Sequence, residues 1–276
     1  MKKNMQIWTV IVFALFLFPV IIQFIPEESK ISNTKIIKEN ALIVYASNVV
    51  EEEVEPVVPT EVSAGKVLLY YTHSHEAYEP MTKAADGKVA VSHHTENIMK
   101  MGEKLKNQLT INGLEAEAIE VDIMKEMLKN RIPYARAYKE IRPHVKKRLA
   151  EKEYDLIIDI HRDAVGPELT TLVHEGQRYA KVAFVVGTDH AGYKQNEQLT
   201  KQLKLQMEKR IPGITRNVIS KGGAGVDGKY NQDLHPKIIL IELGGIGNNE
   251  EELNRTIGVI AEAVKELVEQ GEGTEK

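Results

Sequence analysis

Polar residues that could do chemistry directly follow three apolar runs of this 276-residue chain. His73 and His75 follow residues 67–71, His161 follows residues 156–160, and Glu242 follows residues 238–241. Each run is typical of a buried strand of a parallel sheet, and such sheets place ligand sites beyond the carboxyl ends of their strands. Histidines and a carboxylate gathered at one such edge are the ligands of a zinc hydrolase. These residues therefore predict a shared metal site that only the fold can assemble.

The composition narrows the kinds of site that are available. The formal net charge is −4, so no basic field points to nucleic acid as a partner. Cysteine is absent, which excludes disulfides, thiolate zinc sites and a cysteine nucleophile together. Any metal ion must therefore be held by His, Asp and Glu.

Glu242 stands inside a hydrophobic run, where an unpaired carboxylate is costly. Such a residue needs a metal ion, a hydrogen-bond partner, or a function that exploits a raised pKa. A catalytic zinc ion usually has three protein ligands and leaves a position for water. The sequence leaves the third ligand open, and the candidates are His75, Glu76, His93, His94 and Glu96.

Residues 7–25 form an uncharged, apolar stretch of 19 residues preceded by Lys2 and Lys3. About 20 apolar residues span a bilayer, and the basic flank stays in the cytoplasm. We therefore expect a single-pass anchor that places the rest of the chain outside the cell membrane. The alternative is a cleaved signal peptide, whose apolar core would be about 7–15 residues long. This stretch is longer, and the sequence Phe24-Ile25-Pro26 is a poor cleavage site.

The remaining chain alternates between strand-like and helix-like segments, which argues for an α/β fold with a mainly parallel sheet. The expected strands are residues 67–72, 114–121, 156–160, 180–186, 214–219 and 238–243, and the expected helices are residues 95–109, 134–149, 195–210 and 250–270. The predicted organisation is a cytoplasmic tail (1–6), the anchor (7–25), an extracytoplasmic tether (26–65), a catalytic domain (66–270) and a C-terminal tail (271–276). The glycine-rich loop 221–236 is either a surface turn or a substrate loop.

Four sequence blocks, taken together and in this order, resemble the stage II sporulation protein P family of endospore-forming bacteria. They are residues 72–78, 159–164, 230–234 and 242–244. The first is similar to the family's Thr-His-x-x-Glu-Ser-Tyr signature, and the second matches its Asp-x-His-Arg-Asp block. The resemblance covers residues 67–268 and includes the anchor and the tether.

The resemblance implies a zinc-dependent N-acetylmuramoyl-L-alanine amidase with a six-stranded sheet flanked by helices. It implies that His73 and His161 hold Zn²⁺ and that Glu242 is the catalytic carboxylate. The third ligand is expected at the start of the helix that follows the first strand, where His94 falls. Arg162 is expected to hold a substrate carboxylate or to position Asp163.

The reaction so implied is hydrolysis of the amide between the muramic acid lactyl group and L-alanine in peptidoglycan, with cleavage of peptide cross-links as a second activity. The implied partners are stage II sporulation proteins D and M, at the septal membrane of the sporulating cell. The alternative is a membrane-anchored protein that keeps the fold, binds peptidoglycan and has lost the metal ion. A metallo-β-lactamase-like site is disfavoured, because the Asp-His pair of its motif is missing after His75.

Overall fold

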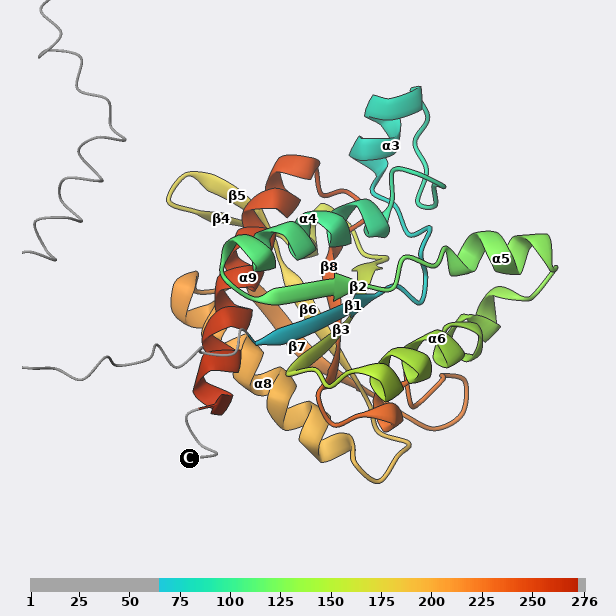
Figure 1. Ribbon diagram of the computed structural model, residues 1–276. Coiled ribbons are helices and arrows are strands. Elements are labelled where there is room, and N and C mark those ends of the chain that lie inside the picture. The colour runs from blue at the N-terminus through green and yellow to red at the C-terminus, as the bar shows by residue number, and fades with distance from the viewer. Residues whose placement is uncertain (1–64, 273–276) are drawn as a thin grey trace, which may run out of the picture. The chain divides into compact units, whose positions relative to one another are not determined.

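The computed structural model describes residues 65–272 (Figure 1). The predicted cytoplasmic tail, the anchor and nearly all of the tether lie outside these residues, as does most of the C-terminal tail. Within the described residues, none of the helices combines the length and the apolar character that a membrane span requires.

The described residues form a six-stranded sheet with helices on both faces, which confirms the predicted α/β fold. The strand order is β2-β1-β3-β8-β6-β7. Four of the five strand pairs are parallel, and only β6 and β8 pair in opposite directions. The strands are β1 (Lys66–Tyr70), β2 (Glu115–Ala118), β3 (Leu156–Asp163), β6 (Val182–Gly187), β7 (Thr215–Lys221) and β8 (Ile238–Gly245).

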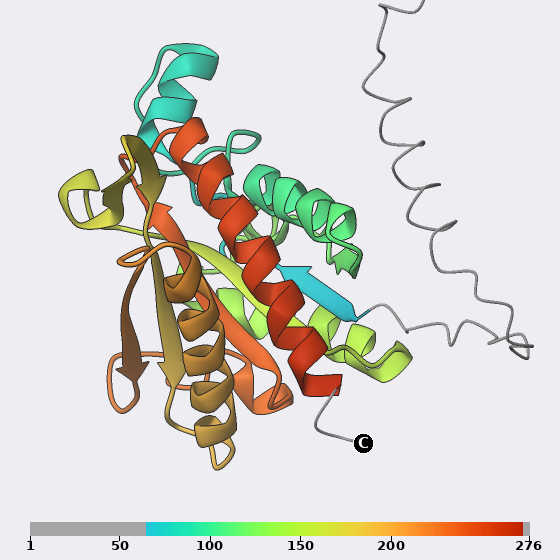
Figure 2. The same ribbon diagram turned by 90° about the vertical axis from the view of Figure 1, so that its left-hand side faces the viewer.

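Alternation along the strands sends apolar side chains to both faces of the sheet. In β1, Val67 and Leu69 join the core on one face, whereas Leu68 and Tyr70 join a second core on the other. The first core packs against α4 (Ile98–Ile111), α8 (Tyr193–Arg210) and α9 (Glu250–Glu272), and Figure 2 shows α8 and α9 lying across this face. The second core packs against α5 (Ile123–Lys129) and α6 (Ala137–Glu151), on the opposite side in Figure 1.

The helix α4 illustrates why the sequence forms these elements where it does. Asn97 caps its amino end by accepting a hydrogen bond from the backbone N–H of Met99 at 3.0 Å. Its buried apolar residues recur at a helical spacing and face the sheet: Ile98, Met101, Leu105 and Leu109. The helix begins three residues later than the sequence pattern predicts, because the cap lies at Asn97.

Strand β3 runs further than predicted, through its polar residues, and β8 runs beyond its predicted end at residue 243, which already included Glu242. β3 ends at Asp163 and β8 ends at Gly245, so His161 and Glu242 lie inside paired strands. The apolar-run rule fails here because only alternate residues point to the hydrophobic core. The side chain of Ile160 points to the hydrophobic core, whereas that of its neighbour His161 projects from the opposite face of the sheet.

Several short elements were not predicted. A hairpin joins β4 (Thr171–His174) to β5 (Gln177–Ala180) through Glu175 and Gly176, whose φ angles are 49° and 76°. Two consecutive positive φ angles are typical of a tight hairpin turn. The others are α3 (Glu79–Asp86), α5 and α7 (Pro167–Thr170), together with the 3-10 turns η2 (Tyr134–Arg136) and η3 (Gln232–Leu234).

Candidate metal centre

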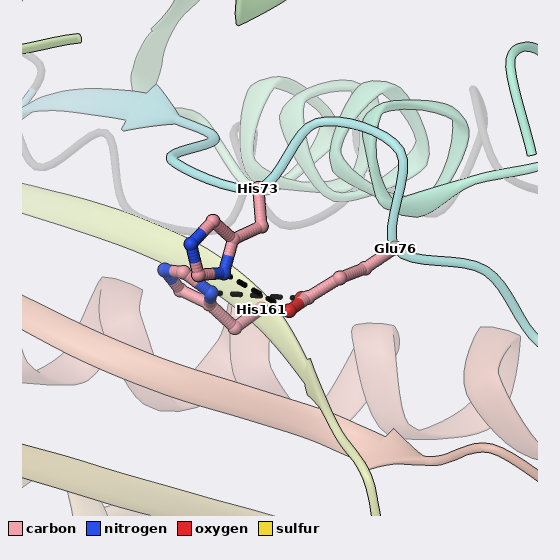
Figure 3. Close-up of side chains that lie close together, drawn as sticks. All are labelled: His73, Glu76 and His161. Carbon is pink, nitrogen blue, oxygen red and sulfur yellow. Dashed lines mark hydrogen bonds and ion pairs between the residues drawn. The ribbon is translucent and has the colours of Figure 1, made fainter. Parts of the chain in front are cut away.

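His73, Glu76 and His161 bring their ligand atoms within 4.8 Å of one another. His73 and Glu76 come from the turn after β1, and His161 comes from β3, so that the three side chains point toward one another (Figure 3). One carboxylate oxygen of Glu76 lies 3.2 Å from Nδ1 of His73, and the other lies 3.5 Å from Nδ1 of His161. Two imidazoles and one carboxylate are a ligand set that zinc hydrolases use.

Hydrogen bonds hold the turn that carries two of these residues against β3. The backbone N–H and the hydroxyl of Thr72 both donate to the buried carboxylate of Asp159, at 3.1 and 2.7 Å. The backbone N–H of Glu76 closes the turn onto the carbonyl of His73 at 2.9 Å. From β3, the backbone N–H of Arg162 donates to Oε2 of Glu76 at 2.8 Å. The turn is therefore fixed in place by the protein itself.

The charges around His161 suit a cation. Burial would raise the pKa of Glu76, but His161 and His73 outweigh burial and hold it well below its usual range. Burial would lower the pKa of His161, but Asp159 and Glu76 raise it well above its usual range. Oδ2 of Asp159 lies 3.0 Å from Nε2 of His161, although that nitrogen has no aligned hydrogen bond within residues 65–272.

This arrangement fits a zinc ion. Nδ1 of His161 faces the carboxylate of Glu76, and Nε2 faces Asp159, as in the carboxylate–histidine pairs that orient metal ligands. A histidine that binds a metal ion must be neutral. An ion bound here would therefore displace the second ring proton of His161, which the charges of Asp159 and Glu76 stabilise.

Glu242 faces the same cavity from β8. It is the register partner of His161, and both side chains line an open cavity of about 640 Å³. Its Oε2 is buried and has no hydrogen-bond partner in the described part of the chain. Burial raises the pKa of Glu242 to about 7; Glu76 and Asp163 add to the effect, and His161 opposes it. A carboxylate with that pKa can both take up and release a proton near neutral pH.

The structure does not bring His94 into this group. Its side chain is exposed, and its ring stacks on His93 with 4.7 Å between centroids. Because α4 starts only at Ile98, His94 lies in the loop before the helix. Glu76, one of the candidates that the sequence left open, lies with His73 and His161, so that it takes the place of the third ligand predicted for His94.

The remaining candidates for a third ligand have other partners. Nε2 of His75 lies 2.9 Å from Oδ2 of Asp122, the residue that caps α5. Nδ1 of His93 accepts a hydrogen bond from the backbone N–H of Glu96 at 2.9 Å, and the carboxylate of Glu96 pairs with Lys100 at 2.7 Å. These contacts shape the loops around the site.

Arg162 lines the cavity, but its guanidinium group is used within the protein. The side chain is only 7% exposed and donates to the backbone carbonyls of Asp163 at 3.1 Å and Val91 at 2.8 Å. The carboxylate of Asp163 forms an ion pair with Arg216. Arg162 thus connects β3 to the loop that precedes α4.

Two aromatic residues that the sequence analysis missed form one wall of the cavity. The ring of Tyr134 stacks on His73 with 4.3 Å between centroids, and Tyr138 meets the same imidazole edge-on at 5.5 Å. They are four residues apart at the start of a helical segment, so they share one side of it. That spacing beside a predicted helix start is the signal that could have found them.

The loop 221–236 also lines the cavity, where the ring of Tyr230 meets Tyr138 edge-on with 5.1 Å between centroids, and this placement favours its interpretation as a substrate loop. Lys221, Gly225, Val226, Asp227 and Tyr230 line the cavity. The backbone of Tyr230 has a φ of 53°, in the left-handed region that non-glycine residues rarely adopt. Such a conformation persists only where the surrounding contacts impose it.

Those contacts come from the three residues that follow Tyr230. The amide group of Asn231 donates to the backbone carbonyl of Tyr138 at 2.9 Å. Both oxygens of Asp233 accept hydrogen bonds from Arg142 of α6, at 2.7 and 2.8 Å. Gln232 bonds to the backbone of β6, donating to a carbonyl at 2.8 Å and accepting from an N–H at 3.0 Å. The block 230–234 therefore attaches the loop to both α6 and the sheet.

Fold and site together define an α/β protein with a candidate His–Glu–His metal centre on one face of its sheet. A family model for stage II sporulation protein P matches residues 23–265, and the chain belongs to that family. Stage II sporulation protein P of Bacillus subtilis (strain 168) is 38% identical over 202 residues, which are 73% of this chain and 50% of that relative. The chain thus spans about half the length of this curated relative.

Three solved structures share a distant likeness with the chain. The CwlD amidase of Clostridioides difficile, in complex with the GerS lipoprotein, has a TM-score of 0.46 and 14% identity, covering 75% of this chain and 98% of that one. A metallo-carboxypeptidase from Burkholderia cenocepacia has a TM-score of 0.44 and 12% identity, covering 76% and 58%. Cwp6 from Clostridium difficile has a TM-score of 0.43 and 10% identity, covering 74% and 30%. Likenesses of this size do not extend to function.

Proposed function

We propose that this protein is a zinc-dependent peptidoglycan hydrolase that cleaves the amide between N-acetylmuramic acid and L-alanine. The observation that carries the proposal is the convergence of His73, Glu76 and His161 to within 4.8 Å, in one cavity with Glu242. Membership of a sporulation protein family supports a role in the cell wall during sporulation.

The chain's own residues supply the proton chemistry of this reaction. A bound zinc ion polarises a substrate carbonyl and acidifies a water molecule in hydrolases of this kind. Glu242 is placed to take a proton from the attacking water and to pass it to the leaving amine. Its raised pKa matches both tasks, because the group is neither a strong acid nor permanently protonated near pH 7.

The walls of the cavity suit a polymer. The cavity is open to solvent and is lined both by Tyr134 and Tyr138 and by the loop 221–236, so that part of a long substrate can enter it. The side chain of Tyr134 is exposed next to His73 and offers a stacking surface beside the reacting groups.

The predicted anchor completes the proposal. A single membrane span at residues 7–25 would leave the catalytic domain outside the membrane, where peptidoglycan lies. The tether would then keep the enzyme close to the wall. Cleavage of cross-links and association with stage II sporulation proteins D and M stay predictions from the family resemblance.

The proposal is tested on the full chain in detergent micelles, with purified peptidoglycan as substrate. The protein is stripped with a chelator, and half of it is reloaded with zinc. Mass spectrometry of the soluble products should show stem peptides with a free L-alanine amino group only in the reloaded sample.

Two outcomes would contradict the amidase proposal. Products that retain muramic acid on the stem peptide would point to a different bond. A protein that sediments with peptidoglycan but releases no product with zinc present would favour the non-catalytic, wall-binding alternative. Elemental analysis of the reloaded protein separates a failure to bind zinc from a failure to cleave.

A further inference from the structure

The cavity that holds the metal centre is lined by six charged side chains, four of them acidic. They are Glu76, Asp163, Asp227 and Glu242, with the basic residues Arg162 and Lys221. Contacts within the protein already satisfy most of these charges. The cationic groups that have no such partner decide which kind of ligand the cavity can bind.

The acidic residues other than Glu242 have partners of their own. Glu76 faces two imidazoles and a backbone N–H, and Asp163 pairs with Arg216. The carboxylate of Asp227 accepts from the backbone N–H groups of Lys229 at 3.2 Å and Tyr230 at 2.5 Å. None of these three carboxylates pairs with Lys221.

Lys221 is the cation that the cavity leaves available. Arg162 is buried and holds two backbone carbonyls, as described above. In the described part of the chain, by contrast, no ion pair or hydrogen bond engages Nζ of Lys221. Nζ lies 6.0 Å from the centroid of the Tyr230 ring, and its positive charge also acts on Glu242, whose pKa burial raises and Lys221 lowers. A lysine over an aromatic face keeps its charge and is held in one direction.

Contacts with the sheet fix the backbone of Lys221, and contacts of the loop 221–236 fix the position of Tyr230. Lys221 is the last residue of β7, so its backbone is fixed by the sheet next to Gly187. Tyr230 is held by the attachments of Asn231 to α6 and of Asp233 to Arg142. The ammonium group therefore has a fixed support in the lining of the cavity that also holds the metal centre.

We propose that Lys221 binds a carboxylate of the substrate and makes this enzyme selective for acidic stem peptides. The inference rests on the proposed function, because it assigns the substrate contact of the same site. A stem peptide supplies such a group, since an acidic residue, D-glutamate, follows its L-alanine within a few bonds of the scissile amide. Of the two roles expected of Arg162, its hydrogen bond to the carbonyl of Asp163 favours the positioning role, which leaves a substrate carboxylate to Lys221.

The test compares two substrates that differ only in this carboxylate. They are N-acetylmuramoyl-L-alanyl-D-glutamine, which has a free α-carboxylate and a neutral γ-amide, and its α-amide, in which an uncharged amide replaces that carboxylate. With the zinc-loaded full chain, we expect kcat/KM to favour the carboxylate by about tenfold, the size of one partly buried charge contact. Lys221→Met should abolish that preference, so that the ratio of kcat/KM for the two substrates falls from about tenfold to about one. Lys221→Arg should retain most of it.

Lys229→Met is the matched control. It removes one positive charge from the same loop, but its exposed side chain lies outside the lining of the cavity. The control should keep the preference of the parent for the carboxylate substrate. Equal losses in Lys221→Met and Lys229→Met would overturn the proposal, because they would reveal a general effect of charge.

A binding measurement keeps this inference separate from the proposed function. Calorimetry with the metal-free full chain gives the affinity for both substrates without any turnover. If the parent cleaves both substrates equally and binds them equally, the role of Lys221 is wrong and the amidase proposal stands. If the parent cleaves neither but still binds the carboxylate about tenfold more tightly than the amide, and Lys221→Met does not, the amidase proposal fails while the anion site stands.

Discussion

His161 and Glu242 are register partners on the adjacent parallel strands β3 and β8. The side chains of register partners project from the same face of a sheet, and neighbouring strands lie about 4.8 Å apart. One residue of the candidate metal centre and the candidate base are thus placed side by side by backbone pairing alone. The two residues are 81 positions apart in the sequence, so only the fold brings them together.

Glu242→Gln removes the proposed base and keeps the shape of the side chain. We expect kcat for amide hydrolysis to fall by about 10²–10⁴, the usual contribution of general acid–base catalysis. Zinc content should stay at the level of the parent, because Glu242 is outside the candidate ligand group of His73, Glu76 and His161. Rate measurements on a muramoyl peptide, paired with elemental analysis, check both. A variant that cuts as fast as the parent would remove Glu242 from the mechanism.

Glu76→Gln and His94→Gln together decide the third ligand. Loss of the Glu76 carboxylate should weaken zinc binding by at least about tenfold, since a neutral amide is a poor zinc ligand. His94→Gln should bind zinc like the parent, because His94 is exposed and stacks only on His93. Competition with a chromophoric chelator measures both affinities. The opposite pattern would restore the assignment made from the sequence.

Arg142→Met breaks the contacts that attach the loop 221–236 to α6. Removing both hydrogen bonds to Asp233 should cost about 1 kcal/mol of unfolding free energy, since the pair is bidentate but partly exposed. Because Tyr230 and Lys221 lose their support, KM should rise more than kcat falls. Denaturant melts and steady-state kinetics measure the two effects.

Arg148→Met is the control for that variant. Arg148 is on the same helix and pairs with Glu117 at 3.4 Å, with 41% of its side chain exposed. Its loss should leave KM unchanged. If Arg148→Met raises KM as much as Arg142→Met does, the effect belongs to α6 as a whole and not to the loop.

Glu208 predicts a pH dependence of stability away from the active site. Burial would raise the pKa of its carboxyl group, but hydrogen bonds from the Thr215 hydroxyl and from the backbone N–H groups of Gly213 and Thr215 lower it. A lowered folded-state pKa stabilises the protein above the unfolded value of about 4.3. That contribution is lost as the pH falls through the folded-state pKa.

Glu208→Gln should therefore destabilise the protein by about 1–2 kcal/mol at pH 7 and by much less near pH 3. Urea melts at the two pH values measure the difference. Glu197→Gln, on the same helix, removes an i,i+4 pair with Lys201 and should change stability by less than about 0.5 kcal/mol at either pH. A penalty for Glu208→Gln that stays constant with pH would contradict the assigned hydrogen bonds.

Much of the fold follows from local patterns in the chain. Apolar runs located the strands β1, β3 and β8, because both of their faces are covered and few polar residues are tolerated there. Helical spacing located α4, α8 and α9. The hairpin β4–β5 was missed because its strands have four residues each and are only partly buried, so that no apolar alternation marks them.

The site was predictable to the extent that it depends on residue type. His73, His161 and Glu242 stood out because histidine and carboxylate directly after apolar runs are costly unless they are used. Lys221 carried no such signal, because a lysine at the end of a strand is ordinary until the partners of every neighbouring charge are known.

The amino-acid sequence by itself determined which residue types could serve, the α/β alternation that brings strands to a common sheet, and the exclusion of cysteine from any metal centre. Only the tertiary structure decided that Glu76 and not His94 joins the two histidines, that Arg162 donates to two backbone carbonyls, and that Nζ of Lys221 has no ion pair or hydrogen bond among the described residues. The physical reason is that periodicity reports the face on which a side chain lies. The partner that it meets depends on strand register and on loop conformations set by contacts between residues far apart in the chain.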